Sequence, residues 1–173
     1  MELAEDKLAE ENFRRALELD RTDSEARNNY GWFLCSRGRY DEGLEQFSAA
    51  LRNPLYAQPE LAMANAGECA ERKGDLALAE ANFGKSLKLQ PDNPNTVLRV
   101  AALRFRQDRL PDAQRLLARY EELSPPTAAS LWLGVRVERK LGDRAQEAAY
   151  GLQLRKRFPN SSEAGLLQSG QYE

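Results

Sequence analysis

Residues able to carry chemistry are scarce in this sequence, because histidine is absent from all 173 positions. Histidine is the commonest general base and transition-metal ligand, so its absence excludes a serine or cysteine triad of the common kind. No glycine-rich phosphate loop or dinucleotide fingerprint is present. Acidic pairs such as Glu10–Glu11 lie on expected helices, where adjacent side chains point about 100° apart. We interpret them as solvated faces and expect no enzymatic activity, no cofactor and no metal site.

The two cysteines, Cys35 and Cys69, are too few for a disulfide scaffold or a structural zinc site. Both fall two-thirds of the way along the first helices of neighbouring repeats, described below. Such helices pack side by side, so two interpretations stay open. The cysteines are either two small buried thiols, the more common state of a helical cysteine, or a disulfide, which export of the protein would favour.

Composition describes a soluble globular chain: 42% of residues are hydrophobic and 30% are charged. Lys plus Arg number 25 against 27 Asp plus Glu, and this net charge of −2 gives no global attraction to nucleic acid or lipid. No apolar run reaches the roughly 18 residues that a membrane span needs. The acidic, helix-forming start at Met1 does not resemble a secretory signal. We expect a protein partner, no nucleic acid and a monomer.

Internal periodicity decides the expected fold. Prolines that end helices recur every 34 residues, and two further series recur with spacings of 34 or 36: large apolar residues in second helices, and turn residues between helices. The three series are Pro91, Pro125 and Pro159; Phe13, Phe47, Phe83 and Leu117; and Gly38, Gly74, Asp108 and Gly142. Glycine suits the turn because that corner favours φ > 0. This is the tetratricopeptide (TPR) pattern of helix–turn–helix repeats.

We therefore predict an all-α superhelical solenoid of antiparallel helix pairs and a single domain over 1–173. The ten expected helices span about 2–19, 24–37, 40–52, 58–73, 76–89, 94–107, 110–122, 126–140, 144–157 and 161–169. The expected repeats are 24–59, 60–93, 94–127 and 128–160. Residues 1–22 represent the second helix of a truncated repeat, and 161–173 a capping helix. We expect fraying of the first helix, whose apolar residues Leu8, Phe13 and Leu17 lack a repeat partner.

First helices line the concave groove of such an array, and the groove is the expected partner-binding site. Aligning the repeats predicts these groove residues: Asn28, Trp32, Asn65, Glu68, Leu98, Phe105, Trp132, Arg136 and Arg139. Trp32 and Trp132 are either anchors for a partner's apolar side chain or repeat core, and core is favoured for Phe105. Arg136 and Arg139 are either a basic end of the groove or solvated surface. Asn29 and Asn65 match a position of chaperone-binding TPR domains, but the accompanying lysines are absent, which disfavours that class.

Segments outside the repeat consensus resemble one family, the TPR lipoproteins of type IV pilus biogenesis and stability (pilotins of the PilF or PilW type). The resembling segments are Asn28–Leu34, the two-residue insertion in the loop Asn53–Tyr56, Ser130–Arg136, Tyr150–Arg155 and Phe158–Ser161. The resemblance implies a protein at the periplasmic face of the outer membrane, tethered by a lipidated N-terminal cysteine. It also implies a role in localisation and multimerisation of the pilus secretin.

This chain departs from that pattern at its start, where the lipidated cysteine and the earliest repeats are missing. The resemblance therefore implies the C-terminal portion of such a protein, holding a secretin segment in its groove. The alternatives are a site on the convex face or in the Pro54–Tyr56 loop, or a different function as a generic TPR adaptor or co-chaperone-like module of another complex.

Overall fold

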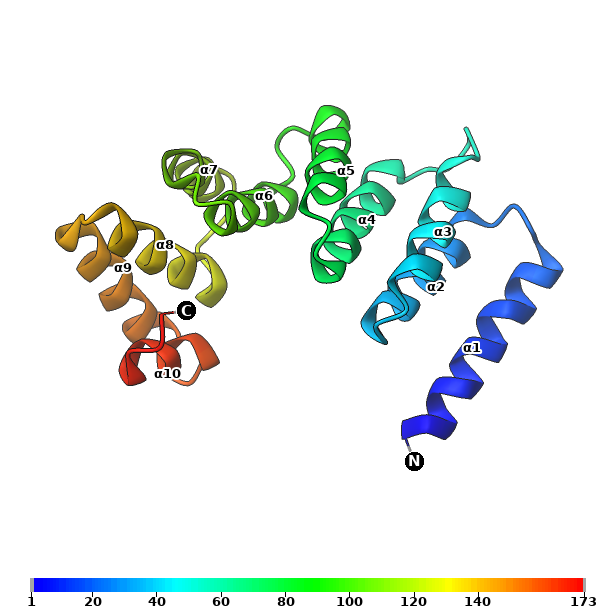
Figure 1. The fold of residues 1–173 in the computed structure, drawn as a ribbon, viewed down its shortest axis with the longest axis horizontal. Coiled ribbons are helices and arrows are strands. Elements are labelled where there is room, and N and C mark those ends of the chain that lie inside the picture. The colour runs from blue at the N-terminus through cyan, green and yellow to red at the C-terminus, as the bar shows by residue number, and fades with distance from the viewer. Residues whose placement is uncertain (1, 173) are drawn as a thin grey trace. The chain divides into compact units, whose positions relative to one another are not determined.

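The computed structural model describes residues 2–172, which form ten α-helices and no strand (Figure 1). The helices are α1 (Glu2–Leu19), α2 (Ser24–Ser36), α3 (Tyr40–Leu51), α4 (Pro59–Lys73), α5 (Leu76–Leu89), α6 (Pro94–Arg106), α7 (Leu110–Leu123), α8 (Ala128–Leu141), α9 (Arg144–Arg157) and α10 (Ser162–Ser169). The expected all-α class is thus confirmed, and the expected bounds agree to within two residues. No helix among residues 2–172 is long and apolar enough to cross a bilayer.

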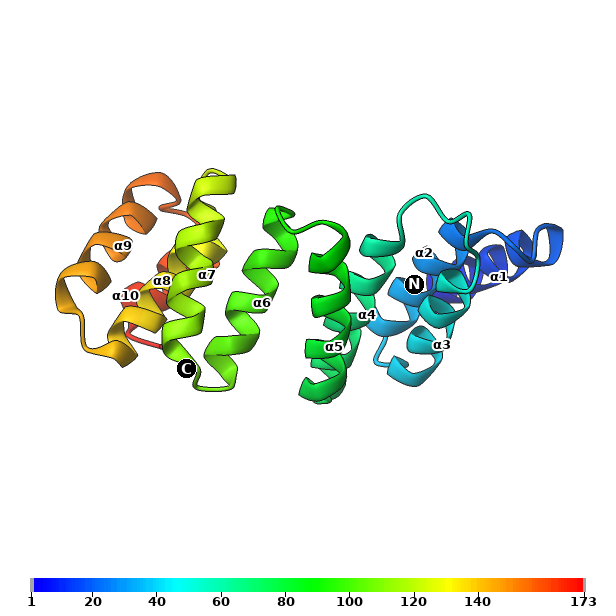
Figure 2. The same cartoon turned by 90° about the horizontal axis from the view of Figure 1, so that it is seen from above.

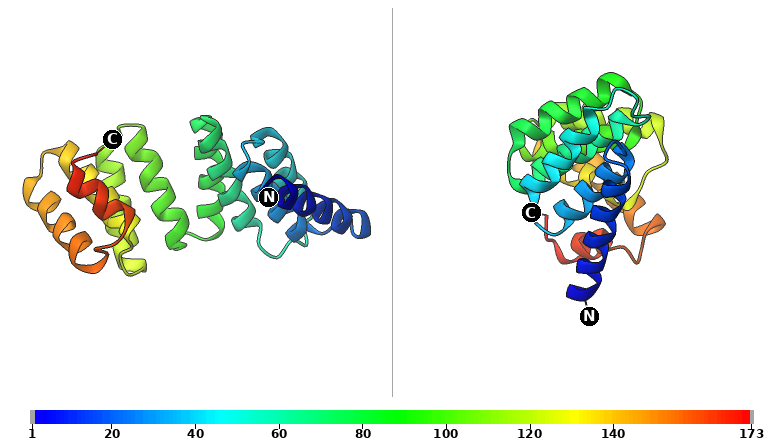
Figure 3. Two further views of the ribbon diagram at one scale, coloured as in Figure 1. Left: turned by 90° about the horizontal axis from the view of Figure 1, so that it is seen from below. Right: turned by 90° about the vertical axis from the view of Figure 1, so that its right-hand side faces the viewer.

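The chain divides into two compact units, residues 1–91 and 92–173. Unit 1 holds α1–α5 and unit 2 holds α6–α10. The expected repeats 24–59 and 60–93 give the pairs α2–α3 and α4–α5, and the other two give α6–α7 and α8–α9 (Figure 2). In unit 2, α10 lies against both α8 and α9 (Figure 3). The single domain over 1–173 stays a prediction.

Local sequence signals set the ends of these helices. Asp23, Asp75 and Asn93 each accept a hydrogen bond from a backbone N–H of the first turn that follows. The corner between the paired helices takes up a left-handed backbone, with φ of 58° at Asp108 and 92° at Gly74. The four corner residues singled out from the sequence all have positive φ, which explains why three of them are glycine.

Close approach of paired helices requires residues without side chains at defined positions. A Cβ added at Gly43 on α3 would contact the Cys35 sulfur and lie 2.8 Å from the backbone oxygen of Gly31 on α2. A Cβ at Gly67 would lie 2.7 Å from the Phe83 ring. Glycine therefore lets the partner helix, or a ring that it carries, lie directly against the backbone.

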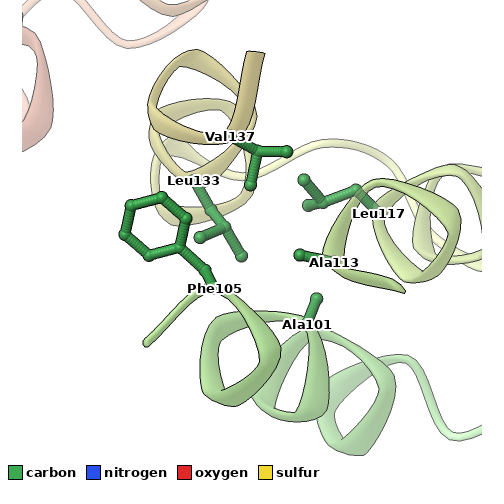
Figure 4. Close-up of a cluster of buried hydrophobic side chains, with 6 residues drawn as sticks. All are labelled: Ala101, Phe105, Ala113, Leu117, Leu133 and Val137. Atoms are coloured by element: carbon green, nitrogen blue, oxygen red, sulfur yellow. The ribbon is translucent and has the colours of Figure 1, made fainter. Parts of the chain in front are cut away.

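Each unit has its own buried clusters. In unit 1, Cys35, Phe47, Ala66 and Cys69 are buried together, with Trp32 packed at their edge. In unit 2, α6, α7 and α8 converge on Ala101, Phe105, Ala113, Leu117, Leu133 and Val137 (Figure 4). A further cluster joins α8, α9 and α10 through Leu131, Trp132, Val135, Leu154 and Ala164. The first helix of every complete repeat therefore contributes to the core on one side and leaves another side for other contacts.

The first helix, α1, packs on α2 through rings and charges. Phe13 stacks on Tyr30 with ring centroids 5.3 Å apart, while Leu8 is 60% exposed. The Glu10 carboxylate accepts hydrogen bonds from Arg39 at 2.7 Å and from the Tyr30 hydroxyl at 3.0 Å. These donors, Arg39 first, lower the pKa of Glu10 from 4.5 to about 2. The partly uncovered apolar face expected for this helix is present, and its fraying stays a prediction.

The close approach at Gly43 predicts a sharp contrast between two glycine-to-alanine substitutions. We expect Gly43→Ala to lower the free energy of unfolding by about 1–3 kcal/mol, because the new methyl group meets backbone that has no room to move. Gly84 on α5 is exposed, with open space at its Cβ position. Gly84→Ala should therefore raise stability by roughly 0.5–1 kcal/mol through helix propensity. Urea unfolding measures both, and equal effects of the two substitutions would contradict the packing argument.

The lowered pKa of Glu10 predicts an acid-dependent docking of α1. A carboxyl whose folded pKa lies below its unfolded value stabilises the fold above about pH 4.5, and this contribution is lost as the pH falls towards 2. We expect the Glu10 carboxyl carbon to titrate near pH 2 by ¹³C NMR. The ring-current shifts of Phe13 and Tyr30 should collapse over the same acidic range. Glu10→Gln should weaken docking at neutral pH, whereas Glu11→Gln at an exposed neighbour should not; a Glu10 midpoint near 4.5 would refute the interpretation.

Candidate protein-binding site

The predicted groove residues fall into one patch on each unit. The unit 1 patch consists of Asn28, Trp32, Asn65 and Glu68, on α2 and α4. The unit 2 patch consists of Leu98, Phe105, Trp132, Arg136 and Arg139, on α6 and α8. Each patch is built by the first helices of two consecutive repeats, which contact each other in both units.

In the unit 1 patch, the asparagines hydrogen-bond each other across the two helices. Asn65 donates from Nδ2 to Oδ1 of Asn28 at 3.0 Å, and Asn28 is only 3% exposed. The side-chain oxygen of Asn28 therefore helps to hold α2 against α4 through this hydrogen bond. Asn65 and Asn29 remain more accessible, and Asn29 accepts from Asn28 at 3.4 Å.

The Trp32 ring is covered by the guanidinium of Arg72, which is paired with the Glu68 carboxylate. The Arg72 guanidinium lies 4.9 Å from the centroid of the Trp32 ring and donates to the Glu68 carboxylate at 2.7 Å. Glu68 itself is 7% exposed, so its charge is compensated within the patch. Trp32 is half-buried against the Cys35–Phe47 cluster. Trp32 thus packs on the core with one side and contacts Arg72 with the other, and its role as an anchor for a partner stays a prediction.

Phe105 is mostly core in unit 2, at 6% exposed, with Leu98 partly buried beside its cluster. Figure 4 shows its ring beside Leu133, within the buried cluster. The ring also carries two cations: the Arg136 guanidinium lies 4.4 Å from the ring centroid and the Lys140 ammonium 5.0 Å. Cation–π attraction at a partly desolvated site explains why these charges lie over an apolar cluster.

Trp132 is also mostly buried, at 7% exposed, but its neighbour is one that the sequence did not predict. Tyr172, beyond α10, stacks on it with ring centroids 5.6 Å apart. The Arg139 guanidinium lies 3.9 Å from the centre of the Tyr172 ring. Tyr172 follows the last repeat and occupies no repeat position, so periodicity gave no signal for it. The sequence did not predict Arg72 for a different reason: it is an exposed residue of α4, outside the apolar positions that the repeat pattern identifies.

The cations of the unit 2 patch differ in how they are paired. Arg139 pairs with Glu147 at 2.8 Å and Lys140 with Asp108 at 2.8 Å. Arg136 has no carboxylate within ion-pair distance among residues 2–172, and burial lowers the pKa of its guanidinium. Its Nε donates instead to the backbone oxygen of Tyr172 at 2.9 Å. Arg136 is therefore held by the Phe105 ring and by the Tyr172 carbonyl oxygen, whereas Arg139 and Lys140 are held by carboxylates.

Cys35 and Cys69 form a disulfide in the structure, linking α2 to α4 with Cα atoms 5.7 Å apart. Both residues are fully buried beneath the unit 1 patch. The bridge closes a loop of 34 residues and fixes the two helices that carry Trp32 and Glu68. Among the described residues, no group of three or more cysteine, aspartate or glutamate side chains is placed to hold a metal ion.

The inserted loop between α3 and α4, the alternative site, is held by its own polar contacts. Asn53 accepts from the Leu55 backbone N–H at 3.0 Å and donates to the Thr22 carbonyl at 3.2 Å. Leu55 is 88% exposed at its tip. The loop thus presents Leu55 as its large exposed apolar side chain, whereas the unit 1 and unit 2 patches each combine rings with charge.

Comparison with known proteins identifies relatives of this chain. Two profiles of the tetratricopeptide repeat match, over residues 12–45 and 36–94. The type IV pilus assembly protein PilF of Pseudomonas aeruginosa is 33% identical over 159 residues, covering 92% of this chain and 63% of that protein. This chain thus spans less than two thirds of that relative's length.

Solved structures that resemble this chain include members of the same group of pilus biogenesis proteins. The P. aeruginosa PilF structure matches with a TM-score of 0.81 at 32% identity, over 95% of this chain and 74% of that one. PilW, a widely conserved type IV pilus biogenesis factor, matches with a TM-score of 0.84 at 35% identity, over 94% and 73%. YrrB, a TPR protein with an unusual peptide-binding site, matches with a TM-score of 0.73 at 17% identity, over 97% and 86%, and shows the fold alone. These matches confirm the TPR solenoid class.

The buried disulfide predicts a large effect of reduction on stability. Chain-entropy arguments for a 34-residue loop give about 3–4 kcal/mol. We expect a reductant to lower the urea midpoint of the wild-type protein by a corresponding amount. The double variant Cys35→Ala with Cys69→Ala should start from the lower midpoint and ignore the reductant. A wild-type midpoint unchanged by reduction would contradict a stabilising bridge.

Proposed function

Because this chain belongs to the PilF and PilW family of TPR proteins of type IV pilus biogenesis, we propose that it is the binding scaffold of a pilotin. In this proposal it holds the pilus secretin subunit and assists its localisation to the outer membrane and its multimerisation. The observation that carries the proposal is the relation to PilF over 92% of the chain. The scaffold acts by binding and takes part in no reaction.

The place of action that we propose is the periplasmic face of the outer membrane. The Cys35–Cys69 disulfide supports this location, because such bonds persist in oxidising compartments such as the periplasm. A lipid anchor of the kind that the family resemblance implies would hold the scaffold at the membrane. The chain itself acts as a monomer in this proposal.

The two patches supply the binding chemistry that we propose. In both, a guanidinium lies over an aromatic ring: Arg72 over Trp32, and Arg136 over Phe105. A partner segment would lay apolar side chains against the ring edges and direct carbonyls and carboxylates at the arginines. Arg136 is the strongest candidate contact, because its guanidinium lies over the Phe105 ring and its Nε already donates to a backbone carbonyl oxygen.

A pull-down of the purified secretin subunit tests both partner and surface. We expect wild-type chain to retain the secretin, and the variant Trp32→Ala, Trp132→Ala and Arg136→Ala to lose it. Since Trp132 is 7% exposed, its loss costs about 3 kcal/mol or more and needs a check of folding. The milder pair Arg136→Gln with Arg139→Gln removes charge alone, and should weaken binding about tenfold, the loss of roughly 1.4 kcal/mol of charged contacts.

The matched control is Arg155→Gln with Arg157→Gln, which removes the same charge from exposed positions on α9. It should bind as the wild type does. Equal loss in both double variants would show a general charge effect and remove the unit 2 patch from the proposal. Binding lost only in Leu55→Ser would move the site to the inserted loop. No binding by the wild-type chain would overturn the secretin as partner and favour an adaptor in another complex.

A further inference from the structure

A surface hollow in unit 1 lies between α3 and α5, the second helices of its two complete repeats. It has a volume of about 440 Å³ and shares no residue with the unit 1 patch. Its apolar walls are formed by Leu44, Leu51, Met63 and Leu78, and the buried Phe47 also lines it. Leu78 is 38% exposed, so apolar surface is open to solvent in this hollow, here called the α3–α5 hollow.

The repeat pattern explains why the α3–α5 hollow is open. Asn82 of α5 lines the hollow, eight residues after the corner Gly74, and the same repeat position holds Leu116 in α7 and Tyr150 in α9. Leu116 and Tyr150 are each packed against a buried cluster of unit 2. Asn82 instead donates from Nδ2 to the carbonyl of Leu78, on its own helix, at 2.9 Å. A short polar side chain therefore stands where the later repeats have a large side chain that packs.

Positive charge lines one part of the hollow. Arg52 directly follows α3, and Lys85 lies in the C-terminal half of α5; both side chains are exposed and line the hollow. No carboxylate of the described residues lines it, although unit 1 as a whole holds more Asp and Glu than Lys and Arg. An apolar side chain with a carboxylate beside it would therefore find both an apolar surface and an opposite charge here.

The hollow differs from its counterpart in unit 2 in what it offers to a ring hydroxyl. Burial, and a hydrogen bond from the hydroxyl to Glu121, raise the pKa of Tyr150. Leu51 holds the same repeat position as Glu121, thirteen residues after the corner, and it lines the hollow. A phenol hydroxyl would lose its acceptor beside Leu51, so a phenylalanine ring suits this hollow better than a tyrosine ring.

We infer that the α3–α5 hollow binds a partner protein segment that inserts a phenylalanine side chain between Leu51, Met63 and Leu78 and places an adjacent carboxylate near Arg52 and Lys85. The partner's ring then takes the place of the large side chain that the chain itself supplies at this repeat position in α7 and α9. The inference goes beyond the proposed function, because the hollow is separate from both patches and its binding does not depend on the secretin.

A peptide titration of the whole chain tests the hollow. The probe is acetyl-Gly-Ser-Phe-Glu-Glu-Ser-amide, followed by NMR through the methyl signals of Met63 and Leu78. We expect saturable shifts of these methyl signals, while the indole N–H signal of Trp32 in the unit 1 patch stays unchanged. Replacing the peptide's Phe by Ala should abolish measurable binding. Replacing Phe by Tyr, or both Glu by Gln, should weaken binding several-fold. These comparisons all use the wild-type chain.

Asn82→Leu tests whether the space itself is the site, because it gives α5 the residue that α7 carries at this position. The leucine should fill the hollow, raise the urea midpoint of the protein and weaken peptide binding at least about tenfold, as expected when one large apolar contact is lost. The raised midpoint shows that the variant is folded. Unchanged peptide affinity in Asn82→Leu would overturn the inference.

The charge at the hollow is tested by Arg52→Gln with Lys85→Gln, which should weaken peptide binding several-fold. The matched control is Arg15→Gln with Lys88→Gln, which removes the same charge from exposed positions outside the hollow and should leave the affinity as in the wild type. Equal weakening in both double variants would refute the assigned contact with the carboxylate.

The hollow and the proposed function can fail separately. Absence of methyl shifts at millimolar peptide, or binding that is indifferent to the peptide's Phe, would overturn the hollow as a binding site. The secretin pull-down, which is tested through the two patches, would be unaffected by that result. Peptide binding as expected, together with no retention of the secretin, would support the hollow and overturn only the secretin as partner.

Discussion

Close contact in the pairs α2–α3, α4–α5 and α8–α9 depends on glycine residues that leave room for a ring or a backbone of the partner helix. Gly31 and Gly43 bring the backbones of α2 and α3 together, Gly67 receives the Phe83 ring, and Gly134 receives the Tyr150 ring. Because a glycine on the first helix faces the second helix in each of these pairs, the pairing interface uses a narrow strip of the first helix. The rest of that helix is left to contact its neighbour in the next repeat and to carry the candidate site.

This division of each first helix explains why the site residues are partly core. Trp32, Phe105 and Trp132 all touch buried clusters, and each also meets a guanidinium or another ring at the surface. The core fixes the ring, and the fixed ring fixes the cation above it. The arginines of the two patches are thus held in place before any partner binds, and such preorganisation lowers the entropy cost of binding. The core alternative holds for the buried side of these rings, and their role as anchors for a partner stays a prediction.

The periodicity of the sequence predicted the features that recur in each repeat, and it did not predict features that occur only once. The helix bounds, the left-handed corners and even the non-glycine corner at Asp108 follow from residues recurring 34 or 36 apart. Tyr172 lies beyond the last repeat, so no recurring position predicts that its ring covers Trp132. The layering of Arg72 over Trp32 depends on side-chain conformations, which spacing does not encode. The cysteine pattern allowed thiols or a bridge, and only the 5.7 Å separation of the Cα atoms makes the bridge geometrically suitable.

The two patches are fixed by interactions of different strength, and this difference bears on how each would respond to a partner. In unit 1, a disulfide and the Asn28–Asn65 hydrogen bond fasten α2 to α4 beneath Trp32. In unit 2, the corresponding cover over Trp132 is one stacked ring and one hydrogen bond from Arg136. Breaking a covalent link is not part of ordinary binding, whereas a ring and one hydrogen bond exchange readily for equivalent groups. The helices of the unit 1 patch are therefore linked covalently, whereas the cover of Trp132 in unit 2 is held by non-covalent contacts.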